Sequence, residues 1–192
     1  MDERSEATYS NIKYEVDYRN VKHARLEYKT GHLLLILPKD YENKQNLLAK
    51  YKTWIAKKER FIEQALTEAK EKSLDLNRTN QELKNTVHLL VDKYHKEYGF
   101  NVNNIYFRRM RTKWGSHSSK GNLTINTLLK YLPMKSVEYV IFHEMAHSRE
   151  RKHNERFWKI VAKKFEDYQI RENELLVYWF LVQGMICAPA IV

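Results

Sequence analysis

The sequence predicts an α+β protein: a small N-terminal antiparallel β-sheet with a long helix, followed by a helix-rich domain with a short β-sheet. Three observations support this fold class. Residues 12–37 contain three short strand-like segments. Residues 43–72 repeat apolar side chains at helical spacing. After residue 76, segments with the helical pattern and segments with the strand pattern follow one another. With 43% apolar and 30% charged residues, the 192-residue chain has the composition of a protein with a packed core. We expect two domains, residues 1–75 and 76–192.

The N-terminal domain is expected to contain three strands and one helix. Residues 12–18 and 24–28 alternate apolar and polar side chains, as half-buried strands do. Residues 33–37 form a continuous apolar strand. The charged residues of the helix at 43–72 lie mostly on its outer face. They indicate a solvated surface and imply no catalytic role. The polar stretch 73–77 is the expected domain boundary.

The C-terminal domain is expected to alternate helices with a short sheet. Gly99 follows a helical pattern and is a favourable residue to end it. Pro133 can open a later helix, because proline is tolerated in the first turn. The predicted elements, in order, are a helix at 79–98, strands at 104–111 and 122–126 with a loop at 112–121 between them, a helix from Pro133, and helices at 154–167 and 171–183.

The helix that opens at Pro133 contains a His-Glu-x-x-His sequence, from His143 to His147. Residues four apart lie on the same face of a helix, so the two imidazoles can bind one ion. Glu144 lies about 100° round the helix from His143, where a base for a zinc-bound water is needed. The pattern predicts a zinc cofactor and Glu144 as the catalytic residue. The alternative is a plain structural helix with two histidines and a surface glutamate.

A catalytic zinc takes about three protein ligands, so a third is expected. His153 follows His147 by six residues and is the preferred candidate. In an unbroken helix it would be rotated about 240° from the ligand face, so the helix must end within residues 148–152. That interval has no glycine or proline, but all of its residues are polar or charged. Glu155 and Glu166 on the following helix are the alternatives.

The net charge of +10 is concentrated in residues 76–192, which carry 19 Lys and Arg against 11 Asp and Glu. This excess indicates either a solvated basic face or a surface for an anionic partner, such as nucleic acid, a nucleotide or an acidic substrate. The cationic cluster consists of Arg108, Arg109, Arg111, Lys113 and Lys120.

The compartment is expected to be the cytoplasm. Cys187 is the one cysteine, which excludes an internal disulfide framework. The chain shows no N-terminal secretory signal and no apolar run approaching about 20 residues, so no membrane partner is expected. The apolar tail at 185–192 is expected to pack on the core. It could alternatively lie in the active-site cleft and hold an enzyme latent. The oligomeric state has no signal in the sequence.

Several ordered motifs resemble the YgjP-like metal-dependent hydrolases, which are zincin-type, metallopeptidase-like proteins related to SprT-like domains. The motifs are Arg109 to Ser116, Ser118 to Gly121, His143 to His147, and His153-Asn154 with Phe157-Trp158. The resemblance implies a zincin-like catalytic domain with zinc bound by three histidines, a glutamate base, and a strand at 123–126 lining the cleft. The family usually has cysteine where this chain has His117, so no cysteine role carries over.

The predicted function is a zinc-dependent metallopeptidase that cleaves peptide or protein substrates with a zinc-activated water. One alternative is a nucleotide or phosphoanhydride hydrolase using the same metal, because a fold does not fix the substrate. The other is a basic nucleic-acid-associated zinc-binding module. The metal ligands implied are His143, His147 and His153. The expected substrate-binding residues are Arg108, Arg111, Trp114, His117 and Asn126, and the candidate oxyanion stabilisers are His117, Tyr168, Tyr178 and Arg108.

Overall fold

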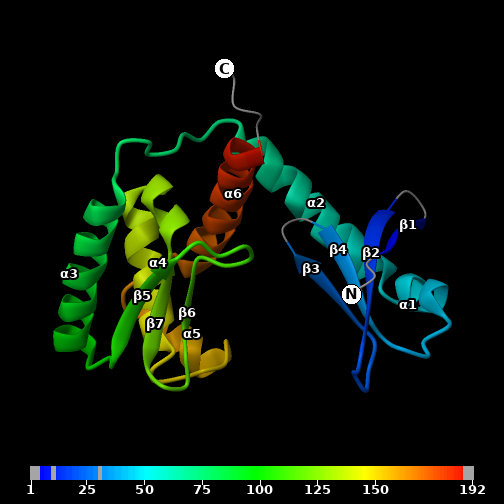
Figure 1. Cartoon of the computed structure of the whole chain (residues 1–192), viewed down its shortest axis with the longest axis horizontal. Helices are drawn as coiled ribbons and strands as arrows, with labels where there is room; N and C mark the ends of the chain where they lie inside the picture. The colour runs from blue at the N-terminus through cyan, green and yellow to red at the C-terminus, as the bar shows by residue number, and fades with distance from the viewer. Residues whose placement is uncertain (1–4, 10–11, 30–31, 188–192) are drawn as a thin grey trace. The chain divides into compact units, whose positions relative to one another are not determined.

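A computed structural model describes residues 5–9, 12–29 and 32–187 of the chain (Figure 1). The chain folds as two compact units, Met1–Gln64 and Ala65–Val192. Each unit combines helices with a small mixed β-sheet, so the α+β fold class is confirmed. None of the described helices is long and apolar enough to cross a membrane.

The first unit is built on a four-stranded sheet. Its elements are β1 (Ser5–Tyr9), β2 (Ile12–Arg19), β3 (Arg25–Lys29), β4 (His32–Pro38), α1 (Lys44–Lys50) and α2 (Lys52–Ala69), of which α2 continues into the second unit. The strand order is β1-β2-β4-β3. All residues from Leu33 to Leu37 are buried, because a continuous apolar strand is stable only where both of its faces are covered.

This sheet is mixed, and the prediction of an antiparallel sheet is wrong. β2 and β4 pair in parallel, with Tyr14 opposite Leu33. The alternating strand β3 tolerates an exposed edge, so the fully apolar β4 takes the inner position between β3 and β2. The helix expected at 43–72 is also divided at Tyr51, into α1 and α2.

The second unit contains a three-stranded sheet of order β5-β7-β6. Its elements after α2 are α3 (Asn80–Tyr98), β5 (Asn104–Arg108), β6 (Gly115–His117), β7 (Asn122–Asn126), the 3-10 helix η1 (Thr127–Tyr131), α4 (Met134–Ala146), α5 (Glu155–Ala162) and α6 (Tyr168–Cys187). β5 runs parallel and β6 antiparallel to the central β7. β6 lies inside the segment that was expected to be a loop. The strand was not predicted, because three residues are too few to show the alternation of a strand.

The helix α4, which carries the His-Glu-x-x-His sequence, runs through the core of the second unit. It packs against α3, β6 and β7 (Figure 1). Tyr139, Ile141 and Phe142 are fully buried, and the Phe142 ring meets Tyr94 of α3 edge to face, with 5.0 Å between centroids. Each such side chain contributes roughly 1.5–3 kcal/mol by burial. The motif helix is therefore a rigid support for the residues it presents.

A polar contact also fixes α4 on its neighbours. Glu138 Oε1 accepts a hydrogen bond from the Tyr94 hydroxyl at 2.7 Å and pairs with Lys164 Nζ at 3.2 Å. Burial opposes ionisation of Glu138, but the contacts with Tyr94 and Lys164 outweigh it and lower the pKa of this carboxyl. A half-buried, ionised glutamate thus joins α4 to α3 and to the segment after α5.

Candidate active site

The chain reverses direction directly after the His-Glu-x-x-His sequence. α4 ends at Ala146, and His147 is its C-cap. A short turn follows, in which Glu150 N–H donates to the Ala146 carbonyl. α5 then begins at Glu155, where the Asn154 side chain accepts from Phe157 N–H at 3.1 Å and caps the helix. The helix break expected within residues 148–152 is confirmed.

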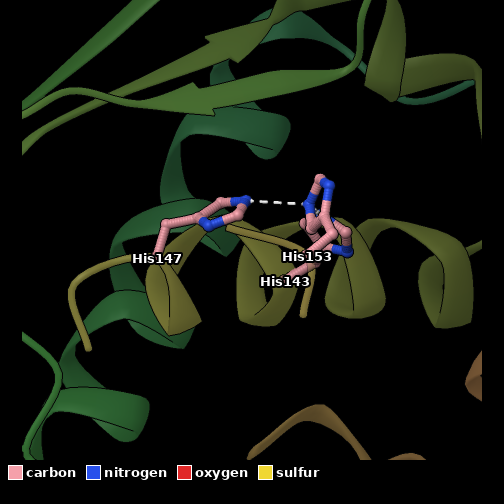
Figure 2. Close-up of side chains that lie close together, drawn as sticks. All are labelled: His143, His147 and His153. Atoms are coloured by element: carbon pink, nitrogen blue, oxygen red, sulfur yellow. Dashed lines mark hydrogen bonds between the residues drawn. The ribbon is translucent and has the colours of Figure 1, made fainter. Parts of the chain in front are cut away.

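The reversal brings three imidazoles together. His153 Nε2 lies 2.9 Å from His143 Nε2 and 3.1 Å from His147 Nε2. Figure 2 shows His143 and His147 rising from α4, with the His153 ring beside that of His143. The ligand nitrogens of the three residues all lie within 4.8 Å of one another. Among the described residues, these three form the cluster that can hold a metal ion.

Polar contacts on the far side of two rings indicate which nitrogen faces the centre. His147 Nδ1 lies 3.0 Å from the backbone oxygen of Glu150, which can only accept. His143 Nδ1 lies 3.0 Å from Glu172 Oε1 of α6. His147 Nδ1 therefore carries a proton, and its Nε2 presents a lone pair to the other rings. His143 Nδ1 faces the Glu172 carboxylate, so its Nε2 is also directed at the centre. Nε2 atoms that face one another at this distance are placed to bind a shared cation.

The pKa values of two of the imidazoles favour the neutral form that binds a metal ion. Burial lowers the pKa of His147 to about 4, and burial also lowers the pKa of His153. These rings are neutral at pH 7, which is the form that binds metal. Burial opposes ionisation of Glu172, but hydrogen bonds with His143 and Tyr139 lower its pKa. Tyr139 O–H donates to Glu172 at 2.6 Å. The donor set fits a divalent metal held by three histidines.

Glu144 lies beside this centre, against the first residue of β6. A Cβ on Gly115 would lie 2.6 Å from Glu144 Cγ, which is too close for any side chain. Glycine at this position therefore lets the carboxylate approach the strand. Burial raises the pKa of Glu144, although the charges of His143 and Lys113 oppose the increase. A carboxyl with a raised pKa is suited to accept and release a proton near neutral pH.

The three histidines and Glu144 open on a cavity of about 340 Å³. Its wall includes Lys113, Gly115, Ser116, His117, His143, Glu144, His147, Arg151 and His153. The strand in this wall is β6, not the 123–126 strand that the family resemblance suggested. The expectation was wrong because β7 is the central strand, paired on both sides, while β6 forms the edge facing α4.

Two of the expected substrate-binding residues have structural partners instead. Asn126 is fully buried; its Nδ2 donates to the carbonyls of Met110 at 3.0 Å and Lys113 at 2.8 Å. Trp114 Nε1 donates to the Leu175 carbonyl at 3.2 Å, and its ring meets Trp179 edge to face. Neither residue is part of the cavity wall. They hold the segment that leads into β6.

Of the remaining expected substrate-binding and oxyanion-stabilising residues, one lines the cavity and the others lie outside its wall. His117 lines the cavity, and its Nε2–H donates to the Asn101 carbonyl at 3.2 Å. Arg108 and Arg111 are exposed and lie outside the cavity wall. Tyr168 stacks on Trp158, and Tyr178 is buried against the Lys72 ammonium.

The alternative third ligands lie apart from the histidine cluster. Glu155 is exposed and pairs with Lys159, and Glu166 is outside the cluster as well. The sequence reasoning missed Gly115, Arg151 and Glu172 as site residues. Glu172 in particular lies on another helix and has no sequence signal that links it to His143. The tail at 185–192 was expected to pack on the core or to inhibit the enzyme. Most of this tail, residues 188–192, lies outside the described part of the chain.

A comparison with known families identifies the class of protein. The model of the YgjP-like family, described as a metallopeptidase domain, matches residues 10–177. The chain therefore belongs to the YgjP-like family of metallopeptidases, as the sequence motifs indicated. No curated protein matches the sequence.

Two crystal structures of metallopeptidase zymogens are similar to part of the chain. Abylysin from Pyrococcus abyssi is 21% identical, with a TM-score of 0.44, over 48% of this chain and 93% of that chain. Jannalysin from Methanocaldococcus jannaschii is 22% identical, with a TM-score of 0.39, over 50% of this chain and 93% of that chain.

Proposed function

We propose that this protein is a zinc-dependent peptidase in which His143, His147 and His153 hold the metal and Glu144 is the general base. The observation that carries the proposal is the convergence of three Nε2 atoms, 2.9 and 3.1 Å from nitrogen to nitrogen, beside the half-buried carboxylate of Glu144. Three histidine ligands leave the fourth position of a tetrahedral zinc for water, as catalytic zinc sites require.

Zinc, when bound, lowers the pKa of its water to about 7 and polarises the carbonyl of the scissile bond. Glu144 accepts the proton of the attacking water and later delivers it to the leaving nitrogen. Its raised pKa makes both transfers accessible near neutral pH. The charges of His143 and Lys113 oppose this increase in pKa.

The edge strand β6 supports a peptide as the substrate. β6 pairs with β7 on one side, and its residues Gly115, Ser116 and His117 all line the cavity. An extended peptide can add to the free edge of such a strand through backbone hydrogen bonds. This addition would place a scissile bond between β6 and the motif helix, within reach of Glu144 and the metal.

The phosphoanhydride alternative depends on cations that grip phosphates at the metal. Arg108 and Arg111 lie outside the cavity wall, but Lys113 and Arg151 line it. The cations therefore do not decide between the two substrates, and the edge strand β6 is what favours a peptide. The nucleic-acid-binding alternative needs a closed metal site, whereas these three ligands open on a cavity of about 340 Å³.

The test compares the zinc-loaded wild-type chain with Glu144→Gln on a panel of unstructured protein, peptides and nucleotides. We expect one zinc per chain in both proteins, peptide cleavage by the wild type, and at least a 100-fold loss in the variant. Glu155→Gln is the matched control, because Glu155 is an exposed glutamate that pairs with Lys159 on α5. Full peptidase activity in Glu144→Gln, or turnover of nucleotides alone, would refute the proposal.

A further inference from the structure

A second hollow adjoins the metal cavity. It has a volume of about 320 Å³, and it shares the wall residues His117, His147 and Arg151 with the cavity already described. His147 is a proposed metal ligand, so the second hollow borders the metal site. A substrate whose scissile bond lies at the metal therefore has a neighbouring group at the mouth of this hollow.

The lining of the second hollow is polar and cationic. Beyond the three shared residues it consists of Asn101, Asn103, Ser118, Ser119, Lys120, Gly121 and Ser148. It contains two permanent cations, Lys120 and Arg151, and no carboxylate. Among the described residues, neither cation forms an ion pair. The nearest acid in sequence, Glu150, accepts instead from Lys152 N–H at 3.2 Å.

The loop at the rim is held in a fixed shape. Asn103 Nδ2 donates to the Lys120 carbonyl at 2.8 Å, and Gly121 N–H donates to the Ser118 carbonyl at 3.0 Å. Gly121 has a φ of +73°, and a Cβ there would lie 2.9 Å from Asn103 Nδ2. Because the turn requires glycine and is closed by these bonds, the rim is arranged before any substrate arrives.

Arg151 is oriented by the same loop. Its Nη2 donates to the Ser119 carbonyl at 3.2 Å. A guanidinium has five N–H donors in a planar fork, and this bond uses one of them. The remaining donors can bind the two oxygens of a carboxylate, which is the geometry that arginine favours. Lys120 adds a second positive charge at the rim.

We propose that this hollow is a specificity subsite that binds a carboxylate of the substrate next to the scissile bond, through Arg151 with Lys120. This inference rests on the proposed peptidase function and names the class of peptide. The carboxylate belongs either to an aspartate or glutamate side chain or to the C-terminus of the peptide. A neutral amide of the same shape lacks the charge that the two cations select.

The first experiment uses the zinc-loaded full-length protein and quenched fluorescent peptides that differ by Glu or Gln beside the scissile bond. Each peptide is made with a free and an amidated C-terminus. We expect about a tenfold higher kcat/KM for the carboxylate-bearing peptide, mainly through KM. A preference for Glu identifies the side chain as the source, and a preference for the free C-terminus identifies the chain end. Equal cleavage of all four peptides would overturn the proposal.

Variants assign the selectivity to the hollow. Arg151→Gln should abolish the preference for the carboxylate-bearing peptide, and Arg151→Lys should restore part of it. Lys159→Gln is the control, because this exposed cation on α5 lies outside both spaces. A preference that survives Arg151→Gln would refute the assignment.

A binding measurement separates this inference from the proposed function. Zinc-loaded Glu144→Gln is titrated with fluorescent Glu and Gln peptides, and anisotropy reports the Kd. We expect about tenfold tighter binding of the carboxylate-bearing peptide, lost in Glu144→Gln combined with Arg151→Gln. If no peptide is cleaved but this difference is found, the peptidase mechanism fails and the subsite stands. Equal binding of both peptides refutes the subsite.

Discussion

Gly115→Ala is the substitution that most sharply tests how β6 and α4 fit together. The new Cβ would lie 2.6 Å from Glu144 Cγ, and an ordinary contact begins at 3.4 Å. Glu144 Cγ must therefore retreat by about 0.8 Å, and the carboxylate it carries must move with it. A catalytic group displaced by roughly 1 Å costs on the order of 100-fold in rate. The three imidazoles are held by other contacts and should stay in place.

The expected result is thus a separation of activity from metal binding. We predict that kcat on a peptide substrate falls about 100-fold, while the zinc content remains one per chain. The free energy of unfolding should fall by about 1 kcal/mol, because the Glu144 side chain can move and relieve part of the clash. Steady-state kinetics, metal analysis and urea unfolding measure these three quantities.

Gly184→Ala is the matched control. Gly184 lies within α6, and no atom lies within 4 Å of the Cβ that alanine would add. Activity should stay at the wild-type level, and stability should rise by up to about 1 kcal/mol through helix propensity. Wild-type kcat in Gly115→Ala would refute the close contact between β6 and Glu144 as a requirement for activity.

Three further predictions follow from single contacts. Glu172→Gln removes the charge that orients His143 Nδ1 at 3.0 Å, so zinc affinity in a chelator competition should fall about 10–100-fold. Glu138→Gln should lower the free energy of unfolding by about 1 kcal/mol at pH 7. The pKa of Glu138 is lowered in the folded state, so this difference is present above the unfolded pKa and disappears as the pH falls through the folded pKa. Asn126→Ala leaves the buried N–H of Met110 and carbonyl of Lys113 without their side-chain partner, so it should cost about 2–3 kcal/mol in urea unfolding.

Each of these predictions has an outcome that contradicts it. Unchanged zinc affinity in Glu172→Gln would mean that the α6 carboxylate does not orient the ligand; Glu174→Gln, an exchange on the same helix, is its control. A Glu138→Gln difference that persists at pH 2 would exclude ionisation as its cause. Wild-type stability in Asn126→Ala would show that water replaces the amide.

The local parts of the site were predictable from the sequence. His143, Glu144 and His147 are spaced by the geometry of one helix, and that spacing alone places both imidazoles on one face. The polar interval before His153 indicated the break that the structure shows. Such features depend on short-range geometry, which a single sequence contains.

The remaining parts depend on contacts between distant segments. Glu172 reaches His143 from another helix, 29 residues later in the sequence. Asn126 has a polar side chain and was expected in the substrate site, but its four hydrogen-bonding partners are backbone groups that only the folded loop brings together. The parallel pairing of β2 with β4 likewise follows from the need to bury the apolar strand β4 between two neighbours. This need depends on the whole sheet and not on one segment.

We propose that three histidines hold one zinc in an open site. X-ray absorption at the zinc edge of the loaded full-length protein tests it directly. We predict three imidazole nitrogens and one further oxygen at about 2.0–2.1 Å, with no sulfur. His153→Ala should reduce the imidazole count to two. A wild-type spectrum with two imidazoles, or with a sulfur ligand at about 2.3 Å, would contradict the account.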